Sequence, residues 1–312
     1  MQELVSSGRV LFGEDESKIV ELKVYAHEFE DKLPSVIELD GRVGAYDIRD
    51  EFPEAPRAFT NPKPIRLLSQ LFDFVLSGDC DLALDFFAGS GTTARAVAAL
   101  NERDQGRRRF ALVQLPEPLD PDAKDQRIAA NFCDTLGKRR NIAELTKERL
   151  RRAAKKVKSE NPLFSGDLGF RVFKLDSSNL RTWEPDRSDV QGSLEAHASP
   201  IKPGRSEQDL LYELLLKLGL ELTVPIEARE IAGKRVHSVG AGTLMACLAE
   251  QIARDEIEPL AQGITAWHAA LAPAGDTQLV FRDAAFEDDV AKTNLVAILV
   301  QAGFKEALIR SL

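Results

Sequence analysis

Cysteine is scarce in this sequence of 312 residues, and no apolar run approaches the ~20 residues that span a bilayer. Cys80, Cys133 and Cys247 are odd in number and far apart, which argues against a disulfide framework and against a zinc knuckle. The four histidines share no metal-ligand spacing, and the first residues lack the basic-then-apolar pattern of a secretory signal. We therefore expect a cytoplasmic protein with no membrane contact and no metal site.

Basic residues are outnumbered by acidic ones, 41 against 50, so the formal net charge is −9. From Ser206 onward there are 9 basic and 16 acidic residues, which places −7 of the −9 in the C-terminal third. This balance excludes a protein whose whole surface binds nucleic acid, and leaves only local contacts open.

A glycine-rich turn is the most informative part of the sequence. Residues 81–93 form the segment Asp-Leu-Ala-Leu-Asp-Phe-Phe-Ala-Gly-Ser-Gly-Thr-Thr, in which an apolar run ends at Asp85 and a helical pattern begins at Thr92. The pattern predicts a strand, a tight turn and a helix N-terminus, an arrangement that binds the polar end of a nucleotide-like ligand. Gly89 and Gly91 allow backbone angles that a Cβ would hinder, and they let a ligand approach the main chain.

The same segment resembles the S-adenosylmethionine-binding motif of amino-methylating DNA methyltransferases, D-P-F-x-G-x-G-T-T, with Phe86 in place of the proline. A dinucleotide-binding fold stays open, because Gly89-x-Gly91-x-x-Ala94 also fits its fingerprint.

Segments on both sides of the turn resemble the methylation subunits of type III restriction–modification systems. They are Gly-Arg-Val-Leu-Phe-Gly at 8–13, Val-Gln-Leu-Pro-Glu at 113–117, Gly-Phe-Arg-Val-Phe-Lys-Leu-Asp-Ser-Ser-Asn at 169–179 and Asp-Leu-Leu-Tyr-Glu-Leu-Leu-Leu-Lys-Leu-Gly at 209–219. Phe-Thr-Asn-Pro-Lys-Pro at 59–64 is similar to the family's motif beside the methionine end of the cofactor.

The resemblance implies S-adenosylmethionine as the cofactor. Lys63 would face its carboxylate, and Glu117, at the tip of the strand expected over 110–115, would accept the ribose hydroxyls. The implied cofactor-binding residues are Asn61, Lys63, Asp85, Phe87, Ala88, Gly89, Gly91, Thr92, Thr93 and Glu117.

Three regions are expected along the chain. Residues 1–58, which alternate short apolar runs with charged loops, would close a target-recognition region. Residues 59–160 would form the S-adenosylmethionine-binding half of a methyltransferase domain, and 165–312 a C-terminal assembly domain. The expected fold is α/β, a partial Rossmann-like methyltransferase sheet followed by a smaller α+β domain, in which 169–175 is a strand and 243–254 a helix.

A basic helix is expected over 138–158, with apolar residues on one side and Arg or Lys over the remainder. Such a face is typical of the solvated surface of a helix that covers a sheet, which is the interpretation we favour. Contact with DNA phosphates is the alternative.

Methylation of an exocyclic amine requires an acceptor for the amine proton and an aromatic platform for the flipped base. The family supplies both through a Pro-Pro motif, and no Pro-Pro pair occurs in this sequence; Asn161-Pro162-Leu163-Phe164 is its nearest match. In the type III order the catalytic motif precedes the recognition region. We therefore expect the catalytic half to come from elsewhere, and the strand at 82–85 to lack one neighbour.

The expected function is site-specific DNA adenine-N6 methylation in a type III-like restriction–modification system, with the chain itself unable to supply the catalytic motif. Expected partners are double-stranded DNA, a chain that carries the missing motif, a second copy in a homodimer, and a restriction helicase–nuclease subunit. The alternatives are a non-catalytic assembly or DNA-binding remnant of such a subunit and a nicotinamide-dependent Rossmann oxidoreductase.

Overall fold

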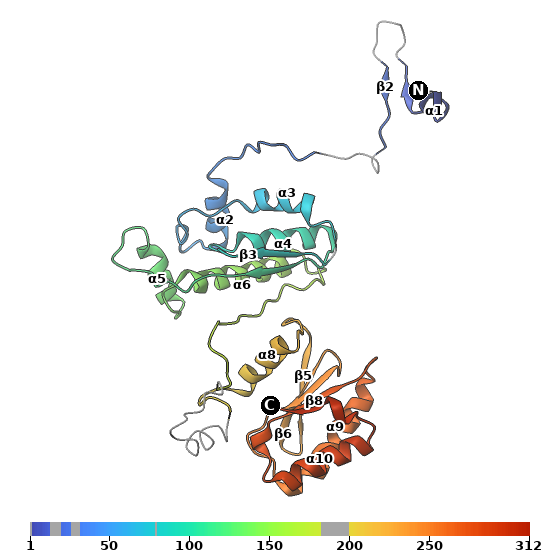
Figure 1. Ribbon diagram of the computed structural model, residues 1–312. Helices are drawn as coiled ribbons and strands as arrows, with labels where there is room; N and C mark the ends of the chain where they lie inside the picture. The colour runs from blue at the N-terminus through green and yellow to red at the C-terminus, as the bar shows by residue number, and fades with distance from the viewer. Residues whose placement is uncertain (1, 13–19, 26–31, 79, 182–199) are drawn as a thin grey trace, which may run out of the picture. The chain divides into compact units, whose positions relative to one another are not determined.

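The computed structural model describes residues 2–12, 20–25, 32–78, 80–181 and 200–312 (Figure 1). The chain divides into two compact units, Met1–Phe170 and Arg171–Leu312. Within the described ranges, no helix combines the length and the apolar character needed to cross a bilayer.

The first unit begins with a short helix, α1 (Gln2–Ser6), and two antiparallel strands, β1 (Val10–Leu11) and β2 (Glu21–Leu22). A further helix, α2 (Val43–Glu51), lies in the region where the sequence indicates only short apolar runs and charged loops. Four of its nine residues are charged, but Ile48 and Phe52, which follows the helix, are wholly buried in a cluster with residues of later helices. Tertiary packing therefore stabilises a helix that its own sequence indicates only weakly.

The glycine turn lies in a strand–helix–strand unit. Helix α3 (Ile65–Val75) precedes β3 (Leu82–Asp85), which is followed by α4 (Thr92–Asp104) and β4 (Arg109–Leu112). The two strands are parallel, with Leu82 opposite Arg109 and Asp85 opposite Leu112. Helices α3 and α4 pack on each other and share a small apolar core with both strands (Figure 1). The predicted strand and the helix start at Thr92 are confirmed.

Strand β3 has one open edge, since β4 alone of the strands in the described residues pairs with it. Ala83 is buried in the core, while Leu82 and Leu84 on the opposite face are 53% and 52% exposed. The unit is mixed α/β as expected. Two strands are too few to establish a Rossmann-like sheet, which stays a prediction.

Two helices complete the first unit, α5 (Arg127–Thr135) and α6 (Ile142–Glu160). The basic helix predicted over 138–158 is α6, and it begins later because the Asn141 side chain accepts a hydrogen bond from the Glu144 N–H. Most of its basic residues are partly or fully exposed. Arg149 is an exception, with an exposed fraction of zero.

The second unit is built on a five-stranded sheet in the order β5-β6-β7-β8-β9. Pairing is antiparallel from β5 to β7 and parallel from β7 to β9. The strands are β5 (Ile226–Ile231), β6 (Lys234–Val239), β7 (Leu244–Cys247), β8 (Gln278–Phe281) and β9 (Ile309–Ser311). Helix α8 (Glu207–Lys217) packs on one face of the sheet, and α9 (Ile257–Leu271) and α10 (Asp289–Gln301) pack on the other (Figure 1). Short 3-10 helices occupy Arg254–Glu256, Asp283–Ala285 and Glu306–Leu308.

Two predictions for this unit are wrong. The helix expected over 243–254 is strand β7 followed by a loop, and 169–175 is not a strand. In β7, Leu244 and Ala246 enter the core under α8, while Met245 and Cys247 enter the core under α9 and α10. A strand buried on both faces is apolar throughout, so periodicity cannot distinguish it from a buried helix.

Candidate ligand site at the glycine turn

The turn between β3 and α4 needs its glycines. Gly89 and Gly91 have φ angles of +48° and +74°, in the left-handed region that favours glycine. A Cβ on Gly91 would also lie 2.9 Å from Cγ2 of Thr146 on α6. The second glycine therefore lets α6 approach the start of α4 closely.

The residues around the turn are held by their own hydrogen bonds. The Thr93 hydroxyl donates to Oδ2 of Asp85 at 2.6 Å, and Oδ1 of Asp85 accepts the Phe87 N–H at 3.0 Å. The Thr92 hydroxyl donates to the Lys63 carbonyl at 3.1 Å. Both threonines are buried, at 4% and 6% exposure. Their hydroxyls join the turn to β3 and to the segment before α3.

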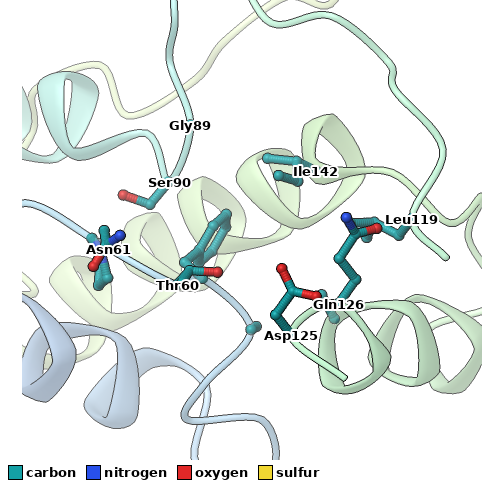
Figure 2. A pocket seen from close by; sticks show the side chains of 12 residues that line it. Thr60, Asn61, Gly89, Ser90, Leu119, Asp125, Gln126 and Ile142 are labelled. Carbon is teal, nitrogen blue, oxygen red and sulfur yellow. The ribbon is translucent and has the colours of Figure 1, made fainter. Parts of the chain in front are cut away.

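A cavity of about 300 Å³ opens beside the turn. Figure 2 shows Thr60, Asn61 and Ser90 on one side of it and Asp125 and Gln126 on the other. The residues that line it are Ala58, Phe59, Thr60, Asn61, Pro62, Gly89, Ser90, Leu119, Asp125, Gln126, Ala129 and Ile142. Among these described residues, Asp125 alone carries a charge. The cavity offers hydroxyl, amide and carboxylate groups over an apolar floor, which suits a polar ligand that is neutral or cationic in this region.

Two of the sequence-predicted site residues, Asn61 and Gly89, line this cavity. Lys63 is exposed and follows the lining residue Pro62 directly. Ala88 is buried, and its N–H donates to the Val113 carbonyl at 3.0 Å. The other predicted residues, which are Asp85, Phe87, Gly91, Thr92, Thr93 and Glu117, lie outside the lining.

Phe87 and Glu117 both stand in solvent. The Phe87 side chain is 85% exposed, and Glu117 lies in the exposed segment after β4. The structure therefore does not bring these two residues to the walls of the cavity.

Sequence reasoning missed the part of the lining that comes after β4. Leu119, Asp125 and Gln126 come from the segment between β4 and α5, and Ala129 comes from the first turn of α5 itself. The Gln126 side chain also accepts the Asp120 N–H at 2.9 Å, which closes this loop on itself. No local pattern indicates this placement, since it depends on the long-range packing of α5.

Side chains of helix α6 bind the carbonyl groups of the turn. The Thr146 hydroxyl donates to the Gly89 carbonyl, and Nη1 of Arg149 donates to the Ser90 carbonyl at 2.9 Å. Arg149 also pairs through Nε with Glu51 of α2, and Arg95 of α4 pairs with the other oxygen of that carboxylate at 2.6 Å. Burial lowers the pKa of the Arg149 guanidinium from its ordinary value. The sequence predicts a solvated face for the basic residues of this helix. Arg149 is one of them, and its wholly buried position corrects that prediction.

Comparison with known proteins identifies relatives over most of the chain. It is 38% identical over 238 residues to the Mod subunit of the type III restriction–modification enzyme EcoP15I from Escherichia coli, a match of 76% of this chain and 34% of that subunit. It is 34% identical over 261 residues to the Mod subunit of StyLTI from Salmonella typhimurium, covering 74% of this chain and 38% of that subunit. A shorter match, 40% over 63 residues, joins it to the type II methyltransferase M.KpnI from Klebsiella pneumoniae, covering 20% of this chain and 15% of that enzyme.

The chain thus spans little more than a third of the Mod subunits that it matches. No protein-family model matches it.

Proposed function

Since the chain is a partial homologue of the Mod subunits of type III restriction–modification enzymes, we propose that it forms the S-adenosylmethionine-binding part of a DNA adenine-N6 methyltransferase. The observation that carries this proposal is the cavity beside the glycine turn, which Asn61 and Gly89 line. Glycine turns between a strand and a helix are a recurrent place for nucleotide-like ligands.

The chemistry of the cavity favours a methyl donor over a dinucleotide. A pyrophosphate needs free N–H groups or cations, but the Gly89 N–H already donates to the Gln114 side chain at 2.8 Å. The one charged residue in the described lining is the carboxylate Asp125, which would repel a phosphate. S-adenosylmethionine carries a sulfonium and an ammonium and has no phosphate. These features speak against the nicotinamide-dependent oxidoreductase.

Lys63 and the acidic residues would act at the two ends of the cofactor. Lys63 is exposed one residue beyond the lining, from where its ammonium would reach the cofactor carboxylate. We propose that Asp125 takes part in holding the ribose hydroxyls, the role that the sequence predicts for Glu117, or the adenine amine. Phe87 and Glu117 would then need to move, or a partner to cover them, before they touch the cofactor.

Methyl transfer would need residues beyond those found here. Asn161, the nearest match to the catalytic motif, ends the polar helix α6, and Leu163 is 93% exposed. The flipped base stacks on an aromatic side chain in a pocket, and none of residues 161–164 lines the cavity beside the glycine turn. We propose that another polypeptide region carries the proton acceptor and pairs with the open edge of β3.

The DNA and protein partners are also proposals, and they rest on the similarity to the Mod subunits. Double-stranded DNA would be the substrate, a restriction helicase–nuclease subunit the partner in cleavage, and the acidic second unit an assembly domain. Arg152 and Lys156 of α6 pair with Glu54 and Asp50 of the α2 region, so part of its basic face serves packing within the unit. This favours a helix that covers the fold over one whose main role is to bind phosphates.

Calorimetry with S-adenosylmethionine and with NAD tests the proposal on the whole chain. We expect heat from S-adenosylmethionine alone, and at least a tenfold loss of affinity in Gly89→Leu, because the new side chain stands in the cavity lining. Gly137→Leu is the matched control: Gly137 also has positive φ, +62°, but its Cβ would meet nothing within 4 Å. Stronger binding of NAD, or equal binding by Gly89→Leu and wild type, would reject the proposal.

Binding that is not followed by methyl transfer would still leave the remnant hypothesis. Incubation of the chain with labelled cofactor, duplex DNA and a Mod subunit defective in its own cofactor site separates the two. Transfer of label to adenine supports the split methyltransferase, and none supports an assembly protein.

A further inference from the structure

A buried ion-pair network joins three helices beneath the glycine turn. Glu51 lies at the end of α2, Arg95 in the first turns of α4 and Arg149 in the middle of α6. The two arginines divide the oxygens of the Glu51 carboxylate between them. The side chains of Glu51 and Arg149 are 4% and 0% exposed, so both charges are withdrawn from water.

A buried ion-pair network of this kind adds little to the free energy of unfolding. Desolvation of two charges costs about as much as their attraction returns, and apolar side chains of the same volume are often as stable or more so. Nη2 of Arg149 has, in addition, no hydrogen-bond partner among the described residues. A charged residue in this place therefore calls for a second role.

The hydrogen bonds of the Arg149 guanidinium indicate this second role. Nη1 of Arg149 donates to the Ser90 carbonyl at 2.9 Å and lies 3.3 Å from the Thr92 hydroxyl oxygen. One turn earlier on α6, Thr146 binds the Gly89 carbonyl. Two successive carbonyls of the turn are thus drawn toward α6, and Gly89 and Ser90 also line the cavity on the other side.

Helix α2 also contacts the segment that forms another wall of the cavity. A Cβ on Gly44 would lie 2.1 Å from the Pro62 carbonyl oxygen, so α2 is in close contact with the segment that precedes α3. Oδ2 of Asp47 accepts the Ile65 N–H at 2.9 Å. The helix that orients Arg149 through Glu51 therefore also fixes the segment that carries Thr60, Asn61 and Pro62.

We propose that Arg149, oriented by Glu51, is a positioning residue that fixes the glycine turn against α6 and so sets the affinity of the cavity for its ligand. Identification of that ligand as S-adenosylmethionine rests on the proposed function. Only an arginine has the planar set of donors that can bind a carboxylate at one edge and a carbonyl at the other. A lysine ammonium has three donors, but they diverge from one nitrogen and do not reproduce the spaced, planar arrangement in which Nε serves Glu51 and Nη1 serves Ser90.

Two measurements on four variants test this proposal. Hydrogen exchange of the amides of residues 88–93, in the ligand-free chain, reports the turn itself. Calorimetric affinity for S-adenosylmethionine reports its consequence. The variants are Arg149→Lys, Arg149→Met, the double variant Glu51→Gln with Arg149→Met, and Arg151→Lys as the control. Arg151 is two positions further on α6, half-exposed, and 3.8 Å from Glu148.

We expect faster exchange at the turn and a 10- to 100-fold loss of affinity in all Arg149 variants, about the factor that one hydrogen bond from a charged donor gives. Arg151→Lys should match wild type in both. The double variant removes the charges of Glu51 and Arg149 and leaves Arg95 with the side-chain oxygen of the new glutamine as its acceptor; whatever its melting temperature, it should not bind more tightly than Arg149→Met. A merely structural role predicts that affinity returns with stability.

Exchange and affinity equal to those of Arg151→Lys would overturn the proposal, as would recovery of affinity in the double variant. If wild type binds no S-adenosylmethionine, the proposed function fails. Exchange at the turn still decides the positioning role in that case, since it is measured without ligand. If Arg149→Met does not fold, the lysine and double variants carry the test.

Discussion

Gly91→Ala should destabilise the first unit for two separable reasons. Alanine at a φ of +74° pays a backbone penalty of about 1–2 kcal/mol. Its Cβ would also stand 2.9 Å from Cγ2 of Thr146, a contact that real Cβ atoms do not make, and overpacking of this kind costs about 1–3 kcal/mol. The expected loss in unfolding free energy is therefore about 2–5 kcal/mol.

A second substitution isolates the contact. Thr146→Ser removes the methyl group that the new Cβ would meet but keeps the hydroxyl that binds the Gly89 carbonyl. The double variant Gly91→Ala with Thr146→Ser should lose only the backbone part, about 1–2 kcal/mol. The non-additivity of the pair measures the steric part directly.

Hydrogen exchange of the core amides of α4 suits this measurement, because the first unit ends at Phe170 and both tryptophans come later in the sequence, at positions 183 and 267. Gly137→Ala is the control, since it has positive φ but open space around its Cβ. Equal losses in Gly91→Ala and Gly137→Ala, or a double variant no better than the single one, would refute the close approach of α6 to the turn.

Two further predictions concern a buried histidine and an open strand. Burial lowers the pKa of His237 below its ordinary value of 6.5, so the unfolded chain takes up a proton that the folded second unit refuses. Its unfolding free energy, followed by Trp267 fluorescence in urea, should fall as pH drops below about 6.5 and fall less in His237→Gln; parallel profiles would contradict this. Leu84→Lys, on the exposed face of β3, should reduce self-association in sedimentation velocity. Val75→Lys, on α3, controls for added charge, and equal reduction by both would remove the open strand as the cause.

Local chemistry determined the elements that the sequence could predict. The glycine turn and the helix start at Thr92 were predictable because they follow from backbone angles within a few residues, and the start of α8 after Ser206 depends on equally local capping groups. In the last case Ser206 and Asp209 form the capping box, and Gly219 has the positive φ expected at the helix end. These contacts join residues that are close together in the sequence, so a sequence pattern can predict them.

The site could be predicted only in part for the same reason. Asn61 and Gly89 belong to recognisable segments, and both line the cavity. Asp125 and Gln126 belong to no such segment and reach the cavity through the return of the chain before α5. In the sequence, Arg149 cannot be distinguished from the other arginines of a basic helix. Its burial is explained by its ion pair with Glu51, which lies 98 positions earlier.

The sequence by itself determined where the chain must turn, because glycine angles and helix caps act within a few residues. Tertiary structure alone decided which side of each element faces its neighbours. It turned the apolar run at 244–247 into a strand between two layers of helices, made a helix of the segment at 43–51, and buried one arginine of α6 against the turn. Such choices depend on contacts between residues that are distant in the chain, whose free energy appears only when the elements pack.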